Sequence, residues 1–259
     1  MSPAATAQRT SNEPEHSTAY YFIEGLNELG IEHLFCNFGT DHAPTIEAMA
    51  EREKHGEKIP NVVLCPHENT AAHMAMGYAA VTGRGQAVLV HVDVGTANTA
   101  NAMHNLFRSR VPVLLMSGKA PYTANNELVG SRDTYVHFVQ EPIDQGALVR
   151  PYMKWEWTLP SGVVVKEALR RAHTIMETKP AGPVYFMAQR ETLTEKWAND
   201  QIRSYPANQF TQPQSGGADP ALIAQLADKI IAAEHPILIC GYAGQSAGAP
   251  KMIEEIARS

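Results

Sequence analysis

The sequence lacks a long hydrophobic run and lacks a cluster of positive charge. No apolar stretch approaches the ~20 residues with which a helix crosses a bilayer, so we expect no membrane partner. The chain carries 21 Lys and Arg against 27 Asp and Glu, a net charge of −6, and the basic residues are scattered. Nucleic-acid-binding domains concentrate positive charge on one face. We therefore expect no nucleic-acid partner.

Cysteine is also scarce. Three cysteines without a CxxC spacing do not make a disulfide framework, and buried thiols in a reducing compartment are the default interpretation. The first 17 residues are polar, carry both signs of charge and lack the apolar middle region of a signal peptide. We predict a flexible tail over residues 1–17 and a cytoplasmic protein.

What the sequence does contain is material for a core, since 44% of its 259 residues are hydrophobic. Runs with helical periodicity alternate with short, continuously apolar runs. The predicted helices cover residues 18–30, 43–54, 67–81, 97–108 and 163–178, and the predicted strands cover 33–38, 61–65, 86–92, 112–118 and 182–187. This alternation is typical of an α/β fold in which a parallel sheet has helices on both faces.

The pattern changes near residue 196. Residues 196–217 lose periodicity and gather Pro, Gln, Asn and Gly, which predicts a linker. Beyond it, a helix over 219–233, a strand over 235–241 and a helix over 247–258 would open a second α/β unit. One strand between two helices cannot bury both faces of a sheet. We therefore predict one domain over residues 18–195 and an incomplete central domain over 218–259.

In parallel sheets, ligands bind beyond the carboxyl ends of the strands, and the segment that follows the second predicted strand contains His67, Glu68 and His73. A zinc protease motif needs its two histidines four residues apart, whereas these are six apart, so we reject a zinc site. Taken alone, Glu68 is an acid in the first turn of a helix, where it complements the helix dipole.

Several short motifs occur together in a fixed order. Residues 35–40 read FCNFGT, 67–79 read HENTAAHMAMGYA, 93–98 read DVGTAN, 139–141 read VQE and 182–184 read GPV. This ordered set resembles the N-terminal pyrimidine-binding domain of thiamine diphosphate (ThDP) enzymes of the acetolactate synthase and 2-oxoacid decarboxylase superfamily. The resemblance covers about residues 18–195 and also implies the α/β fold with helices on both faces.

By this resemblance Glu68 is the catalytic, activating glutamate. Its carboxyl would hydrogen-bond N1′ of the cofactor's aminopyrimidine and favour the imino tautomer. The 4′-imino nitrogen would then remove the proton from C2 of the thiazolium ring. The resulting carbon nucleophile attacks a 2-oxo acid, so the family makes or breaks a carbon–carbon bond next to a carbonyl, with the cofactor as the electron sink.

The resemblance also implies a set of residues that bind the cofactor. These are Phe38, Gly39, Thr40, Glu68, Gly95 and Asn98. Two of them have equally ordinary structural interpretations. Gly39 belongs to a type of strand-to-helix turn in which glycine is common, and Asn98 is a good residue to cap the helix predicted over 97–108.

Four further residues are candidates for the substrate side of the site: Asp41, His42, Gln140 and Arg190. Asp41 and His42 replace small or apolar residues of the family, but benzaldehyde lyase-like members have a histidine at about the position of Asp41 and pyruvate decarboxylase-like members have an aspartate near Thr40. The resemblance therefore implies that Asp41 and His42 are candidate acid–base groups, histidine being tunable near neutral pH. The alternative is a helix N-cap at Asp41 with a solvent-exposed His42. Likewise, Gln140 alone is a surface residue, and Arg190 is either a partner for a substrate carboxylate or an exposed cation.

The family binds its diphosphate through Mg²⁺ with a Gly-Asp-Gly motif that this chain lacks. We therefore expect thiamine diphosphate and Mg²⁺ as cofactors, with the Mg²⁺ ligands outside this chain, a 2-oxo acid or related acyl substrate, and a homodimer or homotetramer. Two alternatives remain open: the pyrimidine-domain subunit of a split decarboxylase, and a catalytically silent binding or regulatory homologue. An NAD-binding Rossmann protein is disfavoured because the phosphate-binding fingerprint is absent.

Overall fold

The computed structural model describes residues 15–204, 213 and 216–258. The chain divides into two compact units, residues 1–212 and 213–259, which are described separately. Residues 1–14 of the predicted tail, and residues 205–212 and 214–215 of the predicted linker, lie outside the described residues.

The first unit is built on a six-stranded sheet in the order β3-β2-β4-β5-β7-β6, in which every neighbouring pair is parallel. Its strands are β2 (His33–Asn37), β3 (Asn61–Leu64), β4 (Gln86–Val90), β5 (Val113–Lys119), β6 (Glu156–Thr158) and β7 (Val184–Gln189). The predicted α/β fold with a parallel sheet is confirmed. The short edge strand β6 was not predicted, because three residues are too few to show a periodicity.

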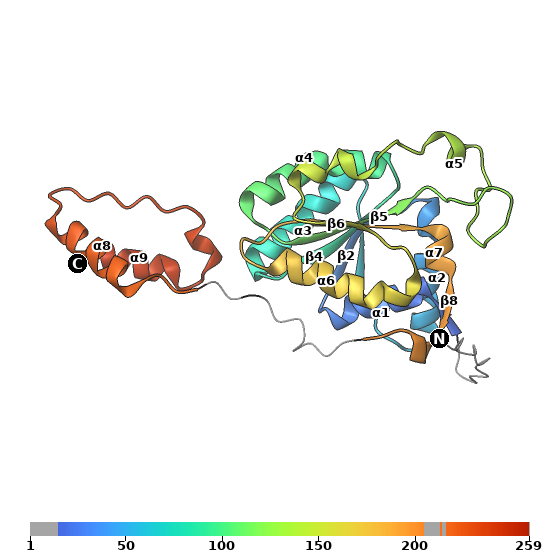
Figure 1. Cartoon of the computed structure of the whole chain (residues 1–259), viewed down its shortest axis with the longest axis horizontal. Coiled ribbons are helices and arrows are strands. Elements are labelled where there is room, and N and C mark those ends of the chain that lie inside the picture. Colours follow the sequence, from blue (N-terminus) through green and yellow to red (C-terminus); the bar gives the residue numbers. More distant parts are fainter. Residues whose placement is uncertain (1–14, 205–212, 214–215, 259) are drawn as a thin grey trace, which may run out of the picture. The chain divides into compact units, whose positions relative to one another are not determined.

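Helices cover both faces of this sheet (Figure 1). One face carries α1 (Thr18–Glu28), α2 (Ala43–Lys54) and α6 (Val165–Glu177), and the other carries α3 (Glu68–Thr82) and α4 (Val94–Ser109). Helix α3 ends at Gly83, whose φ of 72° lies in the left-handed region that glycine adopts most readily. The predicted helix bounds agree closely with these, except that α4 begins at Val94 rather than at residue 97.

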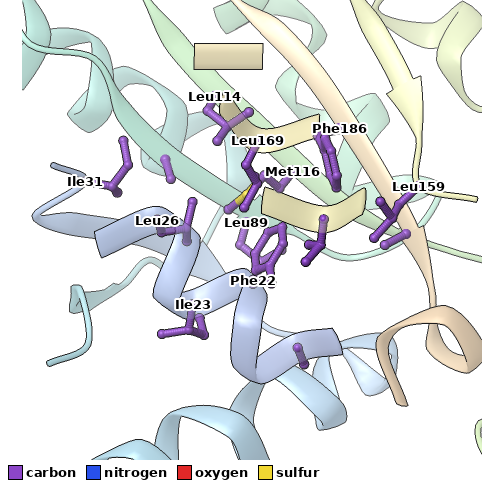
Figure 2. Packing of buried hydrophobic residues seen from close by; sticks show 14 of the residues in the cluster. Phe22, Ile23, Leu26, Ile31, Leu89, Leu114, Met116, Leu159, Leu169 and Phe186 are labelled. Atoms are coloured by element: carbon purple, nitrogen blue, oxygen red, sulfur yellow. The ribbon is translucent and has the colours of Figure 1, made fainter. Parts of the chain in front are cut away.

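The alternation of side chains along the strands divides the core in two. On β5, Leu114 and Met116 face α1, α2 and α6, whereas Val113 and Leu115 face α3 and α4. Figure 2 shows the first cluster, in which Phe22 of α1 gathers with residues of the sheet. Both faces of the central strands are therefore buried, as their continuously apolar runs predicted, whereas the edge strand β3 is largely exposed.

Two predicted boundaries are corrected by a small second sheet. Strand β1 (Glu15–Ser17) lies within the predicted tail, and β8 (Lys196–Ala198) lies within the predicted linker. The two strands pair antiparallel, with His16 opposite Trp197. Each has only three residues and owes its structure to a partner about 180 positions away, so a local pattern does not reveal it.

The long connection between β5 and β6 contains the one-turn helix α5 (Val136–Val139). The chain then passes through two short 3₁₀ turns, Gly146–Leu148 and Arg150–Tyr152, before β6. After β7 it forms α7 (Arg190–Thr194), a short helix that the sequence did not indicate.

The second unit contains α8 (Pro220–Ala232) and α9 (Ala249–Arg258). The strand predicted over residues 235–241 is wrong: no strand forms there among the described residues of this unit. A strand needs a hydrogen-bonded neighbour, and Ile237 and Ile239 are largely exposed instead. Within the described part of the chain, no helix has both the length and the apolar character that a membrane span requires.

We expect Leu114→Ala to lower the free energy of unfolding by about 3 kcal/mol, because it leaves a cavity in the centre of the core. Leu64→Ala is the matched control, since this leucine also lies on a strand of the sheet but is 69% exposed. Urea unfolding of both variants measures the difference. Similar losses in the two would contradict the described packing.

Candidate functional site

The carboxyl ends of three neighbouring strands, β3, β2 and β4, form the edge of the sheet at which the candidate residues meet. Because the strands are parallel, the segments that follow them all leave from the same edge. These segments carry Glu68 after β3, Asn37 at the end of β2, and His91 and Asn98 after β4. Residues up to 61 positions apart in the sequence therefore converge (37 to 98).

Glu68 is the first residue of α3 and is only 7% exposed. Both of its carboxyl oxygens accept a hydrogen bond from an asparagine side chain. Nδ2 of Asn37 donates to Oε1 at 3.0 Å, and Nδ2 of Asn98 donates to Oε2 at 2.9 Å. Two elements of the fold thus hold the carboxyl group in one orientation, and each oxygen retains a lone pair for a further donor.

Asn98 does not cap a helix, contrary to the structural alternative. Helix α4 begins four residues earlier, and Asn98 lies within it with its amide directed to Glu68. The two histidines of the rejected zinc motif have separate contacts: His67 caps α3 by accepting a hydrogen bond from the N–H of Asn69, and His73 is hydrogen-bonded to the carbonyl of Asn69. Within the described residues, no group of three His, Cys, Asp or Glu side chains is arranged to hold a metal ion.

A second group of polar side chains lies beside Glu68. The carboxylate of Asp41, 3% exposed, is hydrogen-bonded to Nδ1 of His91 through Oδ1 and accepts the backbone N–H of Val92 through Oδ2 at 3.1 Å. His42 is 1% exposed, and its Nε2 lies 3.0 Å from the carbonyl oxygen of Val90. The predicted alternative, an N-cap at Asp41 with a solvent-exposed His42, is wrong because both side chains pack inside the protein.

Interactions within this group shift the pKa values of His91 and Asp41 in opposite directions. The hydrogen bond to Asp41 raises the pKa of His91, as do the negative charges of Asp41, Glu68 and Asp93, and these outweigh the opposing effect of burial. Burial alone would raise the pKa of Asp41, but the hydrogen bond to His91 and the neighbouring imidazoles hold it below its usual value. Both shifts favour a carboxylate paired with an imidazolium.

The other predicted cofactor-binding residues surround this edge of the sheet. Phe38 and Gly39 follow β2 directly and are half-buried, and Thr40 is exposed at the start of a 3₁₀ turn. Gly95 is buried in the first turn of α4, where an added Cβ would lie 3.3 Å from the Cβ of His91. Their binding role stays a prediction.

Gln140 and Arg190 lie on other segments. Gln140 ends α5 and is half-buried. Arg190, at the start of α7, has both terminal nitrogens within 3.4 Å of the Asp133 carboxylate, and its side chain is 15% exposed. Arg190 is therefore neither an isolated nor a fully exposed cation.

A buried glutamine fastens the end of the long connection to the sheet. Nε2 of Gln145 donates to the carbonyl of Gly118 at 2.9 Å and lies 2.8 Å from the hydroxyls of Ser117 and Tyr185. The Tyr185 hydroxyl in turn lies 2.8 Å from Oγ1 of Thr96, in the first turn of α4. One side chain thus joins the connection to β5, β7 and α4.

Sequence reasoning did not single out Asn37 or His91. Both are polar residues at the carboxyl ends of adjacent strands. In a parallel sheet this position alone could have marked them as candidate site residues. Asn37 was quoted only as part of a motif, and its contact with Glu68 depends on the parallel pairing of β2 with β3.

Comparisons with known proteins point to one enzyme family. Residues 16–148 match the model of the thiamine pyrophosphate enzyme family's N-terminal TPP binding domain. Benzoylformate decarboxylase from Pseudomonas aeruginosa is 25% identical over 93% of this chain and 42% of its own length. The mitochondrial acetolactate synthase catalytic subunit from Saccharomyces cerevisiae is 25% identical over 98% of this chain and 37% of its own. The chain thus spans about two fifths of these curated relatives.

A solved structure shares the fold. The Rhodococcus jostii RHA1 thiamine diphosphate-dependent 4-hydroxybenzoylformate decarboxylase superposes with a TM-score of 0.67 at 22% identity, covering 88% of this chain and 40% of that one.

We expect Asn98→Ala to lower the free energy of unfolding by about 1–3 kcal/mol, because a buried carboxylate loses one of its two donors. Asn101→Ala is the matched control: it makes the same change in helix propensity on the same helix, at an exposed asparagine. Urea denaturation of the two variants measures the difference, and equal stabilities would show that the contact with Glu68 contributes nothing.

Proposed function

Because the chain belongs to the thiamine pyrophosphate enzymes, through their N-terminal TPP binding domain, we propose that it supplies the aminopyrimidine-binding half of a thiamine diphosphate site. We propose further that the site makes or breaks a carbon–carbon bond next to the carbonyl of a 2-oxo acid or related acyl substrate. Decarboxylases and acetolactate synthases are the relatives named above, which supports a substrate of this class.

The orientation of Glu68 is the observation that carries this proposal. A glutamate at the start of a helix is ordinary, but its burial and its two amide donors at the ligand-binding edge of a parallel sheet are not needed for helix capping. Because Asn37 and Asn98 hold the carboxyl in place, it needs no reorganisation to receive a ring nitrogen. Such preorganisation is how proteins contribute to cofactor chemistry.

The described residues fit the aminopyrimidine portion of the cofactor. Once bound, the cofactor supplies a carbon nucleophile and an electron sink. Glu68 would hold a proton between its carboxyl and a ring nitrogen, and Asn37 and Asn98 would keep that carboxyl from rotating. The turn at Phe38, Gly39 and Thr40 and the first turn of α4 at Gly95 would line the ring with backbone.

The diphosphate portion calls for a different donor set. Mg²⁺ prefers oxygen ligands and usually bridges carboxylates to phosphates, and no candidate metal cluster occurs in the part of the chain that the structure describes. We propose that the Mg²⁺ ligands lie outside these residues and that a homodimer or homotetramer brings the two halves of the site together.

We expect Glu68→Gln to reduce turnover of a 2-oxo acid by at least about a hundredfold, the scale of general acid–base contributions. The amide cannot exchange a proton with a ring nitrogen as a carboxyl does. Decarboxylation of pyruvate and of benzoylformate, assayed in the assembled enzyme with ThDP and Mg²⁺, measures the loss.

Glu47→Gln is the matched control, since it changes an exposed glutamate on α2, and circular dichroism should show both variants folded. Near-normal turnover by Glu68→Gln would refute the assignment. If the assembled wild-type protein fails to bind Mg²⁺–ThDP in a calorimetric titration, the silent homologue is the better description.

A further inference from the structure

The Asp41–His91 pair lies beside Glu68, but it has no part in orienting that carboxyl. Asp41 is hydrogen-bonded to two consecutive residues that follow β4. Its Oδ1 pairs with Nδ1 of His91, and its Oδ2 accepts the backbone N–H of Val92. The imidazole is therefore fixed at Nδ1. Its side chain is 31% exposed, and Nε2 makes no hydrogen bond to any residue in the described ranges. The ring thus presents one nitrogen to an incoming ligand.

Two glycines make room for this pair. An added Cβ on Gly39 would overlap the His91 ring, and one on Gly118 of β5 would overlap the Asp41 carboxylate. Gly39 has a φ of −132°, a conformation open to any residue. Glycine is therefore needed at position 39 because it has no side chain, and not because of its backbone flexibility. The pair is enclosed by the ends of β2 and β5, and this enclosure restricts it to one arrangement.

The titratable groups that bear on His91 favour its charged form. Asp41, Glu68 and Asp93 each contribute negative charge. The fourth group is His42, whose pKa burial lowers despite the nearby Asp41. Its Nδ1 accepts the N–H of Gly39 and its Nε2 lies against the carbonyl of Val90, which is the pattern of a neutral ring. His42 therefore places no positive charge against His91.

The other cation considered for a substrate carboxylate is already paired. Arg190 contacts the carboxylate of Asp133 through both terminal nitrogens. A substrate would have to displace this partner to reach Arg190. His91 differs because its carboxylate partner occupies Nδ1 and leaves Nε2 free to donate.

We propose that Asp41 is a positioning residue that keeps His91 an imidazolium, and that Nε2–H of His91 binds the carboxylate of the 2-oxo acid substrate. This inference rests on the proposed function, since it assigns a partner to that substrate's anionic group. A charge-assisted hydrogen bond of this kind is stronger than a neutral one. It selects acidic substrates over uncharged carbonyl compounds.

The first test measures the titration of His91 in the protein without substrate. Histidine labelled at Cε1 with ¹³C reports each imidazole by NMR, and His91→Gln assigns the His91 signal. We expect Asp41→Asn to lower the pKa of His91 by about 1 unit or more, the usual effect of a removed neighbouring charge. Asp93→Asn, which removes a charge without a hydrogen bond to the ring, should lower it less. Equal titration in wild type and Asp41→Asn would overturn the positioning role.

The second test measures KM and kcat for pyruvate and benzoylformate against pH in the assembled enzyme. Binding needs the imidazolium, so KM should rise as pH rises through the pKa of His91. Asp41→Asn should move this rise to lower pH, and His91→Gln should raise KM about tenfold at neutral pH and abolish the rise. In both variants kcat should change less than KM, as expected when ground-state binding is lost.

The outcomes separate this inference from the function on which it rests. If wild type turns over a 2-oxo acid but its KM does not depend on Asp41 or His91, the substrate contact is refuted and the role of Glu68 stands. If no 2-oxo acid is turned over, the proposed function fails together with the substrate contact. The NMR titration still decides whether Asp41 positions His91.

Discussion

The parallel pairing of β2 with both β3 and β4 is the constraint on which the candidate site depends. It brings three strand ends to one edge, and each end contributes a different chemical group: the amide of Asn37, the carboxyl of Glu68 and the imidazole of His91. The core on either side of the central strands specifies their register, because a slip of one residue would turn buried side chains to the other face. A shift of one residue in β2 would turn Leu34 and Cys36 to the wrong face and carry Asn37 away from Glu68.

Much of the fold was readable from the sequence because its signals are local. The five longer strands are continuous apolar runs, and the helix at 43–54 was predicted with the bounds that the structure has. The strands that were missed, β1, β6 and β8, have three residues each. They are defined by their partners, and three residues are too few to show a periodicity.

The candidate site was predictable to a different degree. Glu68 was identified through an ordered set of motifs, whereas the neighbours that orient it were not, because hydrogen bonds between distant segments depend on topology. Asp41 illustrates the limit: locally it has the position of a helix cap, and only the approach of Gly118, 77 positions later, turns it into a buried partner of His91. Sequence patterns specify residue types at turns, and tertiary packing decides which way those residues face.

The attachment of Gln145 has a consequence for motion near the site. This side chain ties the end of the long connection to β5 and β7, and through Tyr185 to the first turn of α4, the helix that also carries Asn98. A rearrangement of the connection that kept these bonds would be limited to the residues between Gly118 and Gln145. One that broke them would release α4 at its first turn and loosen the orientation of Glu68. A movement confined to the residues between Gly118 and Gln145 would thus leave the Glu68 carboxyl in place.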